Sequence, residues 1–141
     1  MTATASHSAP PRRRPLASVL LFAVAYPLIG VTFALPAHGA ATKPWRWAAW
    51  LASAAVFVIH LWYEHARQRS SPARGATHIA TAVALGALLL AAWINVHGWW
   101  VEPGRFRPWS LIALIAFPVG TGIPAFLAAL AALAGAARSR R

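Results

Sequence analysis

Apolar residues dominate four long segments of this chain, and polar residues gather in the short stretches between them. The segments cover approximately residues 16–35, 47–66, 78–98 and 109–137. A helix needs about 20 apolar residues to cross the ~30 Å hydrocarbon core of a bilayer. Because each segment meets or nearly meets this length, the pattern predicts an all-α integral membrane protein. We expect a bundle of four transmembrane helices, with residues 15–137 as its single domain.

Lysine and arginine are distributed unevenly along the chain, which carries a net charge of +11. Nine of the thirteen lie at the two ends of the chain or between the second and third segments: Arg12, Arg13, Arg14, Arg67, Arg69, Arg74, Arg138, Arg140 and Arg141. The other two connections hold only Lys43, Arg46, Arg105 and Arg107. Because cytoplasmic loops collect basic residues, this bias predicts an N-in/C-in topology. We expect the arginines to attract anionic lipid headgroups, and we expect no nucleic acid as a partner.

Both ends of the chain are polar, so we expect neither to enter the bilayer. Residues 1–14 predict a disordered, basic cytoplasmic arm, and residues 138–141 predict a basic cytoplasmic tail. A cleaved signal peptide is the alternative for the first segment, because Ala37-His38-Gly39 resembles a cleavage site. The apolar core of a signal peptide has only ~7–15 residues, so the longer segment seen here favours a retained helix.

The composition excludes several kinds of chemistry. The chain has no cysteine, so it forms no disulfide and no thiolate metal site. It has no aspartate, and it lacks a nucleophile elbow, a phosphate-binding loop and an HExxH motif, so we expect no enzymatic activity. Twelve of the thirteen basic residues are arginine and alanine is abundant, which is typical of GC-rich bacterial genomes. We therefore expect a bacterial cytoplasmic (inner) membrane as the location.

Tryptophan marks the predicted membrane interfaces. Seven of the eight indoles fall at the predicted outer ends of the helices: Trp45, Trp47, Trp50, Trp93, Trp99, Trp100 and Trp109. Tryptophan prefers the headgroup level because its ring is apolar while its N–H needs a hydrogen-bond partner. This belt agrees with the topology that the basic residues predict.

The fourth segment contains helix-weakening residues near its centre: Pro118, Gly120, Thr121, Gly122 and Pro124. They predict a helix break at mid-membrane depth. Transporters use interrupted helices of this kind, because freed backbone groups can coordinate an ion or a substrate. The alternative is a kink whose free backbone groups are satisfied by neighbouring helices, Thr121 and water.

Polar residues in the second and third segments follow a heptad pattern, with steps that alternate between three and four. The second segment contributes Trp50, Ser53, Phe57, His60, Glu64 and Arg67; the third contributes His78, Thr81, Leu85, Leu88, Ala92 and Asn95. Because such residues share one helix face, the two segments are expected to pair as an antiparallel hairpin. We expect His60 and Glu64 to face His78 and Thr81 at the cytoplasmic end. A secondary seam of Ser53 and Asn95 would extend outward, with Asn95 facing Trp50.

Three functions are open for the cluster of His60, Glu64, His78 and Thr81. It can fix the register of the helices through hydrogen bonds, as polar groups in membrane helices do. It can carry protons or ions, because an ionisable residue within a span is a candidate functional site. Alternatively, His60, Glu64 and His78 can bind a divalent metal, or two histidines can ligate haem b. We expect no cofactor, with haem b or a divalent metal as the alternative.

Small residues recur at helical spacing in the second, third and fourth segments, as in Ala80, Ala84 and Ala87. Small side chains allow close approach of membrane helices, which predicts a tight bundle. The fourth segment has small residues to spare, so a homo-oligomer or a larger membrane partner is expected. The sequence therefore favours a non-enzymatic structural or accessory subunit. The alternatives are a proton, ion or small-solute transport component and, third, a haem- or metal-binding membrane protein.

Overall fold

The computed structural model describes residues 15–34, 42–68, 71–101 and 108–139. Its elements are α1 (Pro15–Ala34), α2 (Thr42–Tyr63), the π-helical turn η2 (Glu64–Gln68), α3 (Pro72–Val101), the 3-10 turn η4 (Pro108–Ile112) and α4 (Ala113–Arg138). The predicted all-α class is confirmed, since the described residues are helical apart from one at the start of α3 and one after α4. The predicted N-terminal arm lies outside the described residues.

Three of these helices are long and apolar enough to cross a membrane, namely α1, α3 and α4. The helix α2 is not among them; its bounds include the polar residues Lys43, Arg46 and His60. The three helices are compatible with a membrane protein, as the sequence predicts.

Two helices begin earlier than the apolar pattern predicts. The start of α2 at Thr42 precedes the predicted boundary near 47, and the start of α3 at Pro72 precedes the predicted boundary near 78. Proline is favoured at the first position of a helix, where its missing N–H costs no hydrogen bond. The backbone N–H of Gly75 donates to the carbonyl of Ser71 at 3.0 Å, which closes the first turn. Residues 72–77, which lie between the second and third apolar segments, are therefore helical.

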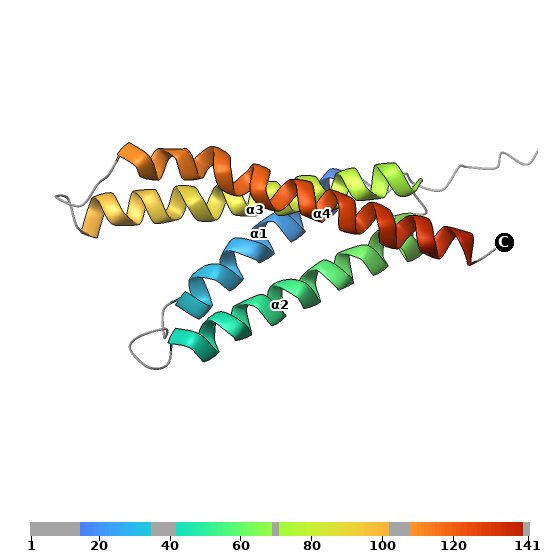
Figure 1. The fold of residues 1–141 in the computed structure, drawn as a ribbon, viewed down its shortest axis with the longest axis horizontal. Coiled ribbons are helices and arrows are strands. Elements are labelled where there is room, and N and C mark those ends of the chain that lie inside the picture. Colours follow the sequence, from blue (N-terminus) through green and yellow to red (C-terminus); the bar gives the residue numbers. More distant parts are fainter. Residues whose placement is uncertain (1–14, 35–41, 69–70, 102–107, 140–141) are drawn as a thin grey trace, which may run out of the picture.

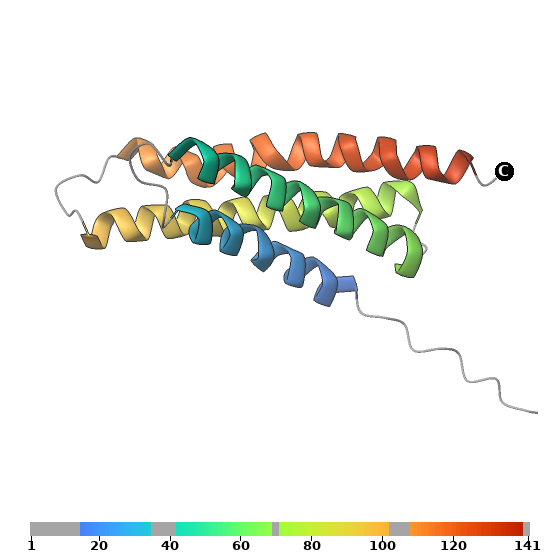
Figure 2. The same cartoon turned by 90° about the horizontal axis from the view of Figure 1, so that it is seen from below.

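The helices pack around α3, which lies against α4 along most of its length and against α1 on another side. Figures 1 and 2 show α3 and α4 as a long antiparallel pair. The helix α2 packs chiefly on α1 and meets α3 and α4 in few places, diverging from them in Figure 1. The predicted hairpin of the second and third helices is therefore wrong along most of its length. A heptad pattern defines a packing face, but it does not say which helix covers that face.

Small residues bring the helix backbones together at two crossings. A Cβ added to Gly86 of α3 would lie 2.8 Å from Tyr26 Cβ and 3.0 Å from the Ala23 carbonyl oxygen of α1. A Cβ added to Gly122 of α4 would lie 3.2 Å from Ala84 Cβ of α3. In lipid, where no hydrophobic effect draws helices together, such close approach supplies the packing energy. Small residues therefore explain why α3 packs against α1 and α4.

The helix α4 runs without interruption through the segment in which the sequence predicts a break. Pro118 and Pro124 lie inside one continuous α-helix, so the break is corrected to an unbroken helix that also contains Gly120, Thr121 and Gly122. Each proline removes only one helical hydrogen bond, and the bonds on either side remain. The hydroxyl of Thr121 donates to the carbonyl of Phe117 at 2.7 Å. Packing of Gly122 on α3 holds this part of the helix in place.

Candidate functional site

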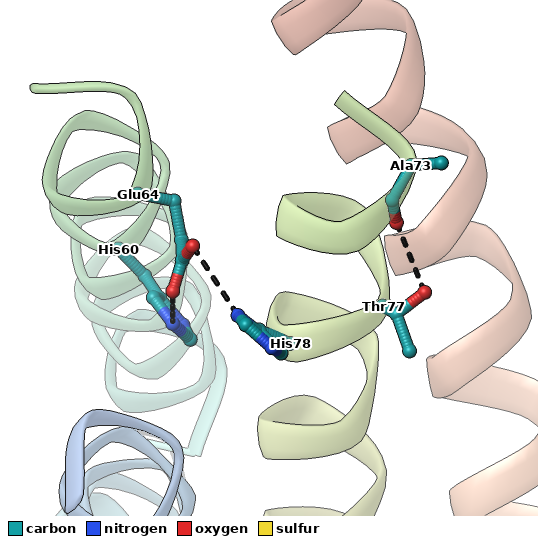
Figure 3. A network of polar contacts seen from close by, with 5 residues as sticks. All are labelled: His60, Glu64, Ala73, Thr77 and His78. Atoms are coloured by element: carbon teal, nitrogen blue, oxygen red, sulfur yellow. Dashed lines mark hydrogen bonds and ion pairs between the residues drawn. The ribbon is translucent and has the colours of Figure 1, made fainter. Parts of the chain in front are cut away.

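A polar cluster lies where the end of α2 meets the start of α3. His60 belongs to the last turn of α2, Glu64 opens the π-helical turn η2, and His78 lies in the second turn of α3. His60 and Glu64 are four residues apart, so their side chains project from the same side of the helix. Figure 3 shows both side chains and that of His78 directed toward one another. The structure thus brings together three of the four residues that the sequence groups at this end.

Two members of the cluster are almost completely withdrawn from the surface. His60 is 0% exposed and Glu64 is 1% exposed, whereas the side chain of His78 is 21% exposed. Buried charged groups are costly unless they are paired. The partly exposed His78 connects the buried carboxylate to the surface of the bundle.

The carboxylate of Glu64 lies between the two imidazoles. Its Oε2 atom is 3.3 Å from Nδ1 of His78, a hydrogen bond whose donor depends on the histidine tautomer. Its Oε1 atom is 4.0 Å from Nε2 of His60, which is longer than a direct hydrogen bond. The carboxylate therefore bonds across to α3 and only approaches the imidazole on its own helix.

An aromatic contact orients His60. Its ring stacks on Phe22 of α1 with the ring centroids 3.9 Å apart and the planes inclined by 10°. Neither ring nitrogen of His60 has a hydrogen-bond partner among the described residues. The imidazole is thus held by stacking and by the nearby carboxylate. The sequence offered no signal for Phe22, because it is one of many apolar residues in the first segment.

Gly75 makes room for the carboxylate at the start of α3. A Cβ at this position would lie 2.8 Å from Leu133 Cδ1 of α4 and 3.8 Å from Glu64 Oε2. The backbone of α3 therefore approaches both α4 and the cluster at this point. This packing role of Gly75 was not predicted from the sequence. The signal that could have found it is a glycine three residues before a polar seam residue.

The remaining residues of the predicted seam lie elsewhere. Thr81 is exposed on α3, and Ser53 is half-buried on α2. Asn95 bonds to η4, the turn that precedes α4, and not to α2: its Nδ2 donates to the Ser110 carbonyl at 3.1 Å, and the Ser110 hydroxyl donates to Asn95 Oδ1. Trp50 is largely exposed, so the predicted contact between Asn95 and Trp50 is wrong. The reason is that α4, and not α2, covers this face of α3.

The local backbone at the cluster is unusual. The π-helical turn Glu64–Gln68 begins at the buried glutamate. Such turns are rare and occur frequently at functional sites. In the part of the chain that the structure describes, no group of three histidine, cysteine or acidic side chains is placed to hold a metal ion. The arrangement of His60, Glu64 and His78 thus offers hydrogen bonding and proton exchange, without a preformed ligand set.

No known protein family, curated protein or solved structure matches this chain. Its function must therefore be inferred from the chemistry of the cluster and from the arrangement of the helices.

Proposed function

We propose that this chain is a four-span integral membrane protein with both termini in the cytoplasm of a bacterial cell. Three helices have the length and apolar character for crossing. The fourth, α2, supports a crossing through its exposed apolar side chains, which include Leu51, Val58, Ile59 and Trp62. Side chains of this kind are stable in lipid and unfavourable in water. The distribution of basic residues supports the orientation.

Single-cysteine labelling tests this topology cleanly, because the chain has no cysteine of its own. Pro44→Cys lies in the first turn of α2, Ser71→Cys lies beyond the other end of α2, and Ser139→Cys lies directly after α4. In intact cells with a permeable outer envelope, a membrane-impermeant maleimide should label Pro44→Cys and leave the other two unlabelled until the inner membrane is opened. Equal labelling of Pro44→Cys and Ser71→Cys in intact cells would show that α2 does not cross.

Within that membrane we propose a non-enzymatic role as a structural or accessory subunit. The observation that carries this proposal is the loose attachment of α2 to α3 and α4, which it meets in few places. Phe57 and Leu61 pack against the α3–α4 core there, whereas Trp47, Trp50 and Leu51 nearer the start of α2 are exposed. Because α2 packs chiefly on α1 and meets α3 and α4 in few places, its other side leaves apolar surface on which a partner helix can pack.

Isolation from native membranes in a mild detergent tests the accessory role. A photo-crosslinking residue at Leu51 on α2 should capture one partner in fixed stoichiometry, and the same residue at Ile115 on the exposed side of α4 serves as the control. The accessory proposal fails if the residue at Leu51 captures no more than the residue at Ile115, or if the purified chain alone carries a saturable flux of solute or protons.

A second candidate is proton transfer through the cluster, favoured by the burial of Glu64 between two imidazoles and by the partial exposure of His78. A carboxylate beside histidine forms a proton relay in many membrane proteins. Proton flux into liposomes, measured for the wild type and Glu64→Gln side by side, separates the two candidates. Flux that disappears in Glu64→Gln would favour transfer, and no flux in either protein would favour the structural role.

A further inference from the structure

The first turns of α2 carry a cationic and aromatic cavity at the end of the helix opposite the cluster. The cavity has a volume of about 430 Å³ and is lined by Lys43, Arg46, Trp47 and Trp50. These residues follow one another by three, one and three positions, so they lie on one face of the helix. Of these four residues, only Trp50 also belongs to the heptad pattern that contains His60 and Glu64.

The electrostatics of this turn favour an anion. Lys43 and Arg46 lie at the N-terminal end of α2, whose first turn contains no acidic residue. Cations are unfavourable there, because the helix dipole already places positive charge at the N-terminus. A bound anion would interact favourably with both side chains at once. Arginine is suited to phosphate in particular, because its planar guanidinium can donate two parallel hydrogen bonds.

The two indoles indicate that the anion is part of an amphiphile. Trp47 and Trp50 are 70% and 72% exposed, and both line the cavity together with the cations. A free phosphate ion has no apolar part and would gain nothing from contact with the two indole rings. A phospholipid headgroup presents its phosphate beside glycerol and the first methylenes of its acyl chains, which suit tryptophan at the interface. Contact between Phe33 of α1 and Trp45, with ring centroids 5.9 Å apart, holds this end of α2 near α1.

We propose that Lys43, Arg46, Trp47 and Trp50 form a binding site for the phosphate headgroup of an anionic phospholipid. The two cations bind the phosphate and the two indoles contact the glycerol and upper acyl region. This site rests on the proposed crossing of the bilayer by α2, which places the first turn of α2 at the outer headgroup level. It is distinct from the general attraction of the terminal arginines for anionic lipid, because it combines charge with a cavity.

Native mass spectrometry of the full-length protein tests the site. The protein is released from detergent micelles that contain equal amounts of phosphatidylglycerol and phosphatidylcholine, and the lipid that remains bound is counted. Wild type should retain phosphatidylglycerol selectively. Lys43→Gln with Arg46→Gln should weaken this retention by about 30-fold, the factor expected for removing two basic residues near an anionic lipid. Lys43→Arg should retain it.

A matched variant separates the site from overall charge. Arg74→Gln with Arg138→Gln also removes two exposed basic residues, at positions outside the cavity, and should retain clearly more phosphatidylglycerol than the cavity variant. Equal loss in both double variants would overturn the proposal, since the binding would then follow net charge. Trp47→Ala with Trp50→Ala should also weaken retention, and unchanged retention would overturn the role of the indoles.

Competition identifies the source of the phosphate. Glycerol 3-phosphate at millimolar concentration should fail to displace the lipid, and full displacement would make this a site for a soluble phosphate ester. Labelling of Pro44→Cys distinguishes the two ways of failing. If Pro44→Cys and Ser71→Cys label from opposite sides but no selective lipid is retained, the site is wrong while the topology stands. If they label from the same side, the proposed crossing itself is wrong.

Discussion

The Oε2 atom of Glu64 lies 3.3 Å from the Nδ1 atom of His78, and this contact joins two helices that otherwise meet in few places. Glu64 is the first residue of η2, directly after α2, and His78 lies near the start of α3. The contact therefore links the two sides of the connection between α2 and α3. Its position explains why α2 can diverge from α3 and α4 elsewhere and still be linked to α3 at this end (Figure 1).

Two substitutions of Glu64 should show whether its hydrogen bond or its charge stabilises the folded protein. Glu64→Ala leaves the buried His60 ring without its nearby carboxylate and removes the bond to His78, so we expect a loss of about 1–2 kcal/mol in unfolding free energy. Glu64→Gln keeps the shape and a hydrogen bond, and its loss should be smaller. Thermal unfolding in detergent measures both, with His65→Gln next to the cluster as the control. Equal losses for Glu64→Ala and His65→Gln would contradict a stabilising role for the cluster.

Gly86 and Gly98 lie in the same helix and provide a matched pair. An added Cβ meets Tyr26 Cβ at 2.8 Å at Gly86 and meets nothing within 4 Å at Gly98. Gly86→Ala should therefore destabilise the protein by about 1–3 kcal/mol through overpacking against α1. Gly98→Ala should be neutral or stabilising by up to about 1 kcal/mol, because alanine favours helix over glycine. Chemical unfolding in mixed micelles gives both values, and a mild Gly86→Ala would argue against the α1–α3 crossing.

Asn95 and Ser110 should be energetically coupled. The side chain of Asn95 bonds both to the Ser110 backbone and to its hydroxyl, across the ends of α3 and η4. A double-mutant cycle of Asn95→Ala and Ser110→Ala should give a coupling of about 0.6 kcal/mol, the usual value between membrane helices. The cycle of Asn95→Ala with Trp50→Ala should be additive, because Trp50 is exposed on α2. Coupling to Trp50 in place of Ser110 would restore the hairpin that the heptad pattern suggests.

Phe22 should position the imidazole of His60. Phe22→Leu removes a stacked ring whose centroid lies 3.9 Å from that of His60, and we expect a cost of about 0.5–1.5 kcal/mol. The ring proton shifts of His60 in an NMR spectrum should change with it, since the ring current of Phe22 is lost. Leu21→Ala changes the adjacent, exposed residue and should leave those shifts in place. Unchanged shifts in Phe22→Leu would show that the stacking is not formed in solution.

The chemistry of the cluster followed from the sequence to a large extent. The heptad spacing of His60 and Glu64 placed them on one face of a helix, and the expected pairing of the second and third segments placed His78 near them. The structure brings these three together, as predicted. Phe22 and Gly75 escaped detection because stacking and close approach depend on which helices are neighbours, and a local pattern carries no such information.

The sequence by itself determined that the chain is all-helical, with long apolar helices whose faces of small and polar residues can be read from their periodicity. It does so because hydrophobic length and the 3.6-residue repeat are local properties. Only the tertiary structure decided that α3 packs on α4 and α1, that Asn95 meets Ser110, and that the proline-containing α4 stays continuous. In lipid these choices depend on how closely two backbones can approach, as Gly86 and Gly122 show, and that property belongs to pairs of helices.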